Sequence, residues 1–106
     1  METDDEERFQ AEEVHMSVLV QMRVTAPDVD QFVAAHNKFA PLFAEMGATN
    51  RRVFRSESDP NEVTLMADWE SHDAMHAASE KYGDDFNKEA GTEGLEWETR
   101  IWHQLD

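Results

Sequence analysis

Apolar and polar residues alternate along four segments of the chain, and a period of two residues predicts β-strands. These segments are residues 17–25, 48–58, 63–70 and 95–105. In the first, the residues predicted to face a core are Val18, Val20, Met22 and Val24. Between the second and third segments, Asp59-Pro60-Asn61 has the chemistry of a type I turn, with proline where its fixed φ is needed. We therefore expect a hairpin there.

A period near 3.6 residues predicts a first helix that follows Asp28, a good N-cap, with Gln31 in the capping-box position. The apolar stripe of this helix consists of Val29, Phe32, Val33, His36, Phe39, Ala40 and Phe43. Pro41 disfavours the helical state of Ala40, so a kink or a break is expected at this point. Gly47 is expected to end the helix.

A second helix is predicted to begin after Ser71, whose hydroxyl can cap it. Asp73 lies in its first turn, where the helix dipole favours an anion. Gly83 is expected to stop this helix at about Tyr82. A shorter helical piece, residues 84–90, is then expected before the last strand.

The predicted order is therefore strand, helix, strand, strand, helix, strand. This is the order of the ferredoxin-like βαββαβ fold, an α+β fold with a four-stranded antiparallel sheet and both helices on one face. The first and last strands are apolar on both faces, so the helix-free face needs a cover. A second copy of the sheet is the simplest cover. We predict a homodimer whose sheets pack face to face.

The first 15 residues contain seven acidic side chains and one basic one. Such a segment cannot bury enough apolar area to fold alone, so we predict a flexible acidic arm over residues 1–15. Residues 16–106 are then predicted to form one small domain. A chain this short gains stability from dimerisation, because it buries a smaller share of its surface than a large one.

The charge of the chain excludes several classes of partner. Its 24 Asp and Glu against 9 Lys and Arg give a formal charge of −15, which repels nucleic acid and anionic lipid. No apolar run approaches the length of a membrane span, so we expect a cytoplasmic protein. The chain has no cysteine, which excludes disulfides and thiolate nucleophiles. The acidic, lysine-poor composition fits either a high-salt habitat or an ordinary acidic protein.

Two side chains are candidates for a site between helices and sheet. Trp69 ends the third strand on the face that meets the helices, where it can stack against an aromatic ligand or simply anchor the core. His36 interrupts the apolar stripe of the first helix, and a buried histidine needs a hydrogen-bond partner. It is either a satisfied core residue or a group that exchanges a proton near neutral pH.

Histidines and arginines suggest further chemistry. His72 and His76 share one helical face and could chelate a metal, but no third or fourth ligand is evident, so we predict no metal site. Alternation places Arg51 on one face of the second strand. It can hold an anionic substrate group, or pair with an acid such as Asp68 or Glu70 on a neighbouring strand. Phosphate-binding glycine loops and the G-x-S-x-G motif are absent from the sequence.

Four stretches together resemble the antibiotic-biosynthesis-monooxygenase-type domain of the dimeric α+β barrel superfamily. They are A-P-L-F-A-E-M-G, R-R-V-F-R-S-E-S, D-P-N-E-V and D-W-E-S-H-D-A-M-H, and the resemblance covers about residues 16–105. It implies a relation to cofactor-free quinol-forming oxygenases, haem-degrading oxygenases or polyketide cyclases. The haem-degrading branch is a poor match, since its pattern expects asparagine where the first strand offers Gln21 or Ser17. His76 matches the usual histidine of the family.

From the residues and the resemblance we predict a small-molecule enzyme similar to cofactor-independent, quinol-type monooxygenases. An aromatic or hydrophobic substrate would bind between sheet and helices, against Trp69, Phe39 and Phe43. His36 or His76 would act as the base, and Gln21 or Arg51 would stabilise the developing negative charge. No cofactor and no metal are expected. The alternative is a non-catalytic, ligand-binding or stress-related protein that uses the same pocket.

Overall fold

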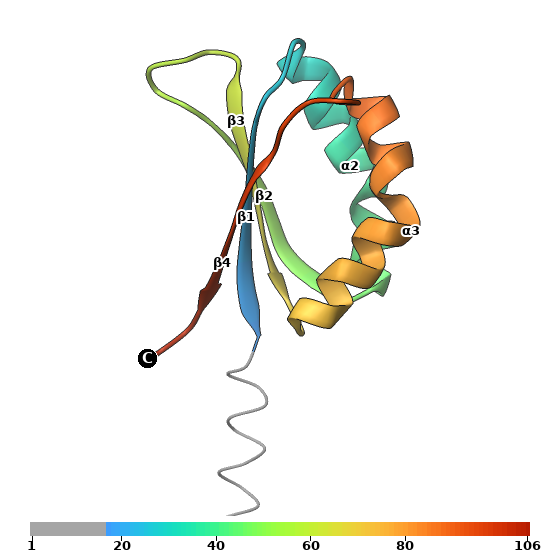
Figure 1. Ribbon diagram of the computed structural model, residues 1–106, viewed down its shortest axis with the longest axis vertical. Helices are drawn as coiled ribbons and strands as arrows, with labels where there is room; N and C mark the ends of the chain where they lie inside the picture. The colour runs from blue at the N-terminus through green and yellow to red at the C-terminus, as the bar shows by residue number, and fades with distance from the viewer. Residues whose placement is uncertain (1–16) are drawn as a thin grey trace, which may run out of the picture.

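A computed structural model describes residues 17–106; the predicted arm, residues 1–15, lies outside them. The elements follow the order β1 (Val18–Thr25), α2 (Val29–Glu45), β2 (Ala48–Arg55), β3 (Glu62–Trp69), α3 (His72–Ala90) and β4 (Glu98–His103). The four strands form one antiparallel sheet in the order β2-β3-β1-β4. Figure 1 shows both helices on the same face of this sheet. The predicted ferredoxin-like α+β fold is confirmed.

The core lies between the sheet and the two helices. β1 and β3 pair with Val18 opposite Trp69 and Val20 opposite Ala67, which places these buried side chains on the helix-covered face. Phe32 and Phe39 of α2 and Phe86 of α3 are buried against them. None of the helices within residues 17–106 is long and apolar enough to cross a membrane.

The helix α2 begins as predicted but is not broken at Pro41. The Asp28 carboxylate accepts a hydrogen bond from the Gln31 backbone N–H at 3.1 Å. Pro41 lies inside the continuous helix Val29–Glu45, so a break at this residue was the wrong expectation. Pro41 is exposed, and so is Asn37, whose carbonyl loses its intrahelical partner and can turn to water. Burial of Phe39 and Phe43 on the opposite side holds the helix together.

The helix α3 continues through Gly83 to Ala90, so the predicted stop at Gly83 is wrong. Glycine inside a helix costs about 1 kcal/mol relative to alanine. Burial of an aromatic side chain such as Phe86, which lies one turn further on, contributes more than this. Gly91, with φ of 73°, is the residue that ends the helix.

Two strands are shorter than predicted. β4 starts at Glu98 rather than at residue 95, because Thr92 and Leu95 form a turn in which the Leu95 N–H donates to the Thr92 carbonyl at 3.2 Å. β2 ends at Arg55 rather than at residue 58. There the Ser56 hydroxyl accepts hydrogen bonds from the backbone N–H groups of Ser58 and Asp59, at 3.2 and 3.3 Å. These local bonds turn the chain out of the sheet.

The face of the sheet away from the helices has no cover within residues 17–106 (Figure 1). Pairing of Leu19 with Trp102 places both side chains on this face. Phe54 and Trp102 are 45% and 47% exposed, which is high for aromatic residues on a sheet. Gln21 also lies here, and its side-chain oxygen accepts a hydrogen bond from the Trp102 indole N–H at 3.2 Å.

Candidate functional site

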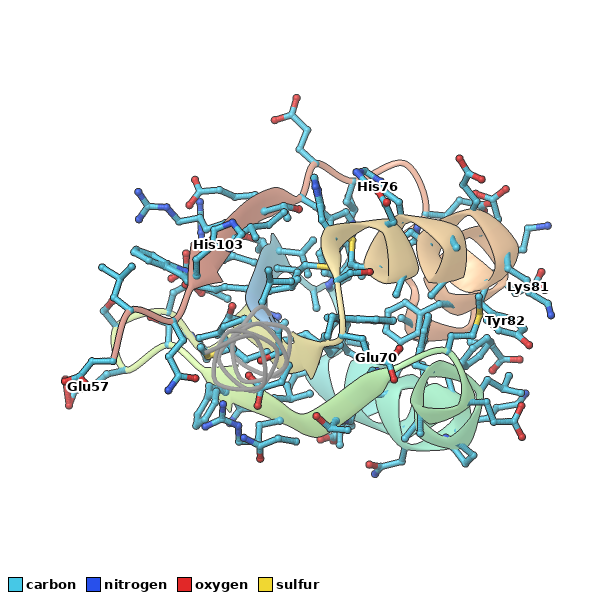
Figure 2. The ribbon with its side chains drawn as sticks, turned by 90° about the horizontal axis from the view of Figure 1, so that it is seen from below. Glu57, Glu70, His76, Lys81, Tyr82 and His103 are labelled. Carbon is cyan, nitrogen blue, oxygen red and sulfur yellow. The ribbon has the colours of Figure 1, made fainter. Side chains whose placement is uncertain are left out.

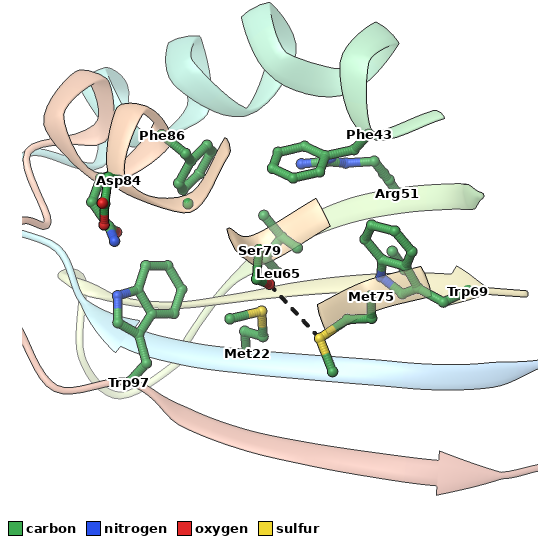
Figure 3. Close-up of a pocket in the computed structure, with 13 residues that line it drawn as sticks. Met22, Phe43, Arg51, Leu65, Trp69, Met75, Ser79, Asp84, Phe86 and Trp97 are labelled. Atoms are coloured by element: carbon green, nitrogen blue, oxygen red, sulfur yellow. Dashed lines mark hydrogen bonds between the residues drawn. The ribbon is translucent and has the colours of Figure 1, made fainter. Parts of the chain in front are cut away.

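A cavity of about 290 Å³ lies between the helix-covered face of the sheet and α3. Its sheet side is formed by Met22, Arg51, Leu65, Ala67 and Trp69. Phe43 of α2 and Trp97, which precedes β4, close it on two further sides. The residues of α3 that line it are Met75, Ser79, Gly83, Asp84, Phe86 and Asn87. Figure 3 shows how these side chains surround the space.

The cavity exists because two small residues of α3 face it. Ser79 and Gly83 are four residues apart and therefore share one face of the helix, which Met75 continues one turn earlier. A Cβ atom added at Gly83 would meet no other atom within 4 Å. A larger residue at this position would project into the space. Gly83, which sequence analysis interpreted only as a helix stop, is thus one of the residues that keep the cavity open.

Aromatic rings form much of the wall. The Phe43 ring contacts Trp69 and Phe86 edge-to-face, with 6.2 Å between ring centres in each pair. Trp97 contacts Phe86 at 6.5 Å. Trp69 is 6% exposed and lines the cavity, so it is at once a core residue and a wall residue. Phe39 lies behind the wall: it packs on Phe43 and Phe86 without lining the cavity.

A β-bulge directs Arg51 into the cavity. Thr49 pairs with Asp68 and Arg52 with Met66, so β2 has one more residue than β3 over this span. Asn50, with φ of 53°, absorbs the extra residue. In a regular strand Ala48 and residue 51 would point to opposite faces of the sheet. Because of the bulge, Arg51 lies on the same helix-covered side as Ala48.

The Arg51 guanidinium is held by two neighbours. Its Nη2 donates to His36 Nδ1 at 3.0 Å, and its Cζ lies 4.5 Å from the centre of the Phe43 ring. Within residues 17–106 it forms no ion pair, and its buried Nε has no hydrogen-bond partner there. Removal from water lowers the pKa of Arg51 to about 10, which leaves it charged at neutral pH.

His36 is the neutral partner of this cation. Its side chain is buried, and it does not line the cavity. Burial, together with the charge of Arg51, lowers the pKa of His36 to about 4. Because arginine can only donate, Nδ1 must accept and the ring proton is assigned to Nε2. Arg51 thus satisfies the hydrogen-bonding need of His36, and His36 fixes the guanidinium.

The remaining predicted residues lie elsewhere. His76 is exposed and stands on the side of α3 turned away from α2 (Figure 2). Its ring lies 4.4 Å from that of His72. Within residues 17–106 no group of three or more His, Cys, Asp or Glu side chains could hold a metal ion. Gln21 is on the opposite face of the sheet from the cavity.

Sequence analysis did not single out the polar residues of α3 that reach the cavity. Asp84 lies beside Trp97, at the end of the cavity away from Arg51 and Trp69 (Figure 3). Asn87 also lines it, and its side-chain oxygen accepts a hydrogen bond from the buried Thr92 hydroxyl at 2.7 Å. That bond leaves the Asn87 amide N–H₂ as a donor. The spacing of Ser79, Gly83 and Asn87 was the available signal: small or polar residues every four positions.

Comparison with known structures supports the fold. A proposed antibiotic biosynthesis monooxygenase from Bordetella bronchiseptica matches with a TM-score of 0.72 at 20% identity, covering 84% of this chain and 97% of that one. SnoaB, a cofactor-independent oxygenase from Streptomyces nogalater, matches in a mutant form with a TM-score of 0.67 at 21% identity, covering 86% and 95%. At such identities the likeness concerns the fold. No curated protein shows significant sequence similarity.

The sequence itself matches a family model. Residues 16–83, which include β1 through the greater part of α3, match the model described as antibiotic biosynthesis monooxygenase. The matched span contains Arg51, Trp69 and Gly83, but ends before Asp84 and Trp97. The resemblance seen in the sequence is thereby confirmed, and the chain belongs to the antibiotic biosynthesis monooxygenase family.

Proposed function

We propose that the protein is a monooxygenase that oxidises an aromatic substrate in this cavity with dioxygen and without an organic cofactor. The observation that best supports the proposal is the composition of the cavity wall. It combines four aromatic rings with one guanidinium, that of Arg51; the rings are those of Phe43, Trp69, Phe86 and Trp97. An apolar pocket with few polar groups is the usual form of a small-molecule site. Family membership and the fold shared with SnoaB support the type of reaction.

The reaction that suits these residues is the oxidation of a phenol to a quinone. Loss of the hydroxyl proton gives a phenolate, which transfers one electron to dioxygen. The phenoxyl radical and the superoxide then combine at a ring carbon, and the peroxide takes up a proton. The carbon that bears the hydroperoxide then loses its hydrogen as a proton, the O–O bond breaks, and water leaves. The quinone remains. The substrate supplies all the electrons, and one oxygen atom enters each product.

Arg51 stabilises the phenolate in this scheme. A charge-assisted hydrogen bond in a site poor in water favours the anion over the phenol and so lowers the phenol pKa. The predicted bases stand further away: His36 reaches the cavity only through Arg51, and His76 is exposed outside it. Their action as a base stays a prediction, and the proposal needs from His36 only that it positions Arg51.

Oxygen consumption with a panel of naphthols, anthrols and hydroquinones tests the proposal. We expect turnover that needs dioxygen, and one ¹⁸O atom in the quinone formed from a naphthol or anthrol when the reaction runs under ¹⁸O₂. Gly83→Leu places a side chain in the cavity and should abolish turnover, whereas Gly83→Ala should retain most of it. Turnover that persists without oxygen contradicts the proposal and indicates a cyclase or isomerase.

A second candidate is a non-catalytic protein that binds an aromatic ligand in the same cavity. The observation that favours it is that neither His36 nor His76 lines the cavity. Turnover by the unaltered protein separates the two functions, because ligand binding without turnover of any substrate in the panel favours the binding protein. If turnover is found, the variant with both His36→Gln and His76→Gln tests whether either histidine acts as the base: ligand affinity should remain, and only a role as the base would abolish turnover.

We also propose that a second copy of the chain covers the open face of the sheet. Leu19 and Met66 lie half-buried in the middle of this face, between the more exposed Phe54 and Trp102. The area is apolar in a chain with a net charge of −15, and exposed apolar patches of this kind mark interfaces. Self-association through one common surface gives a dimer with two-fold symmetry.

A further inference from the structure

The two ends of the cavity have opposite charge. Arg51 stands at the end formed by Trp69 and Met75, and Asp84 stands at the other end, next to Trp97 (Figure 3). Among the described residues that line the cavity, these are the only charged side chains. Aromatic and aliphatic side chains lie between them. The helix positions of Met75 and Asn87 differ by 12 residues, and the cavity therefore extends over about 18 Å of α3.

From this arrangement we infer that the ligand is an aromatic monoanion that binds in one orientation, with its anionic group on Arg51 and a hydroxyl group at Asp84 and Asn87. The inference rests on the proposal that the cavity is the ligand site, and it adds the class and orientation of the ligand. A phenolate or an aryl carboxylate provides the anionic group. Arg51 and Asp84 are then the residues that determine specificity.

Arg51 is prepared for an anion by its surroundings. It is a partly buried cation to which no carboxylate of residues 17–106 is paired, although the chain has 24 acidic residues. Within residues 17–106 the other partly buried cation, Arg23, does find acids, Glu62 and Glu98, whereas the remaining Lys and Arg side chains are exposed. An anionic ligand would compensate the charge of Arg51 and bring the strong hydrogen bonds that guanidinium groups form with carboxylates.

His36 is a positioning residue in this arrangement. The ring accepts a hydrogen bond from Nη2 without lining the cavity itself, and the guanidinium lies over the Phe43 ring. A long arginine side chain fixed by two contacts loses less conformational entropy when a ligand binds. Because His36 is neutral, it holds the cation without neutralising it.

The other end of the cavity excludes a second anion. The Asp84 carboxylate repels a negatively charged group but accepts a hydrogen bond from a hydroxyl. The Asn87 amide, oriented by Thr92, offers a donor to the same hydroxyl oxygen. A ligand with an anionic group at one end and a hydroxyl at the other therefore satisfies both ends, whereas the reversed orientation leaves Arg51 without an anion and places the anion beside Asp84.

Anaerobic calorimetric titration with three naphthalenes of similar shape tests the inference. The probes are 6-hydroxy-2-naphthoate, 6-hydroxy-2-naphthamide and naphthalene-2,6-dicarboxylate. We expect the hydroxynaphthoate to bind about 10- to 100-fold more tightly than the neutral amide, the range for a charge-assisted hydrogen bond. The dicarboxylate should bind about 3- to 5-fold more weakly than the hydroxynaphthoate, because Asp84 is exposed and partly screened.

Neighbouring residues provide matched control variants. Arg51→Met should remove the preference for the hydroxynaphthoate over the amide, while Arg52→Met, which removes an equal charge on the other face, should not. Asp84→Asn should make the dicarboxylate bind as tightly as the hydroxynaphthoate. Asp85→Asn changes a neighbour that does not line the cavity and should leave the difference in affinity. His36→Leu should weaken hydroxynaphthoate binding, and His36→Gln, which retains an acceptor, should restore it. Thermal unfolding of each variant verifies that it folds.

Three results would overturn the inference: equal affinity for the hydroxynaphthoate and the amide, the same effect from Arg51→Met and Arg52→Met, or no binding of any probe. Because binding is measured without oxygen, the outcome is separate from that of the proposed function. The expected selectivity without quinone formation in any aerobic assay would refute the monooxygenase and leave the ligand class standing.

Discussion

Acidification should destabilise the protein through His36 in a measurable way. The pKa of this histidine falls from an ordinary 6.5 to about 4 in the folded protein. Between these two values the unfolded chain binds a proton that the folded chain does not bind, so the free energy of unfolding decreases as the pH falls from 6.5 towards 4. Above pH 6.5 the ring is neutral in both states, and the contribution is constant.

The magnitude follows from the two pKa values. Going from pH 7 to pH 4.5, protonation of an unfolded histidine with a pKa of 6.5, compared with a folded one near 4, removes about 2 kcal/mol of stability. His36→Gln keeps an acceptor for Arg51 and cannot titrate. The variant should therefore lose about 2 kcal/mol less than the unaltered protein over the same pH change, with the carboxylates contributing equally to both.

Urea unfolding at pH 7 and 4.5, at one fixed protein concentration, gives the comparison. The control is His103→Gln, which makes the same substitution at an exposed position. Nuclear magnetic resonance of the imidazole protons gives the pKa of His36 directly. The reasoning fails if the ring titrates near 6.5, or if His36→Gln and His103→Gln lose equal stability on acidification.

Three further predictions concern the helix, the open face and the surface charge. Gly83→Ala should stabilise the protein by about 0.5–1 kcal/mol, measured by urea unfolding, because the site is helical and unobstructed, whereas Gly94→Ala, at φ of 77°, should destabilise it. Trp102→Glu should convert the proposed dimer to a monomer in sedimentation velocity, while Leu105→Glu, at 96% exposure, should not; a monomeric unaltered protein would contradict the interface. Added NaCl, from about 0.1 to 1 M, should raise the melting temperature by screening the charge of −15, and no change would show that repulsion is unimportant.

The strands and the topology could be predicted because the alternation of apolar and polar residues depends only on which face of the strand is buried. Val18, Val20 and Val24 of β1 reveal the core face without any knowledge of their neighbours. Pro41 and Gly83 misled the prediction because their local preference is weaker than packing. Phe39 and Phe43 around the proline, and Phe86 beyond the glycine, bury enough area to hold the helices continuous.

The site was harder to predict from the sequence, because it depends on the β-bulge in β2 and on the cavity beside α3. Alternation in β2 gives no sign that Asn50 is an extra residue, yet the bulge decides which side Arg51 takes relative to Ala48. His36 was correctly recognised as a residue that needs a partner. The partner could not be named, because Arg51 reaches His36 only after the bulge has turned it to the side of the sheet that α2 covers.

The proposed anionic ligand would account for a partly buried Arg51 that has no carboxylate partner. In the free protein the lowered pKa of Arg51 shows that burial disfavours its charge, and neutral His36 offers a hydrogen bond but no compensating anion. A carboxylate from the chain would stabilise the fold, but it would also occupy the cation that an anionic substrate needs. Residues 17–106 include many acids, and none of them pairs with Arg51. The proposed aromatic anion should therefore stabilise the fold as well as complete the site, and that stabilisation should depend on Arg51.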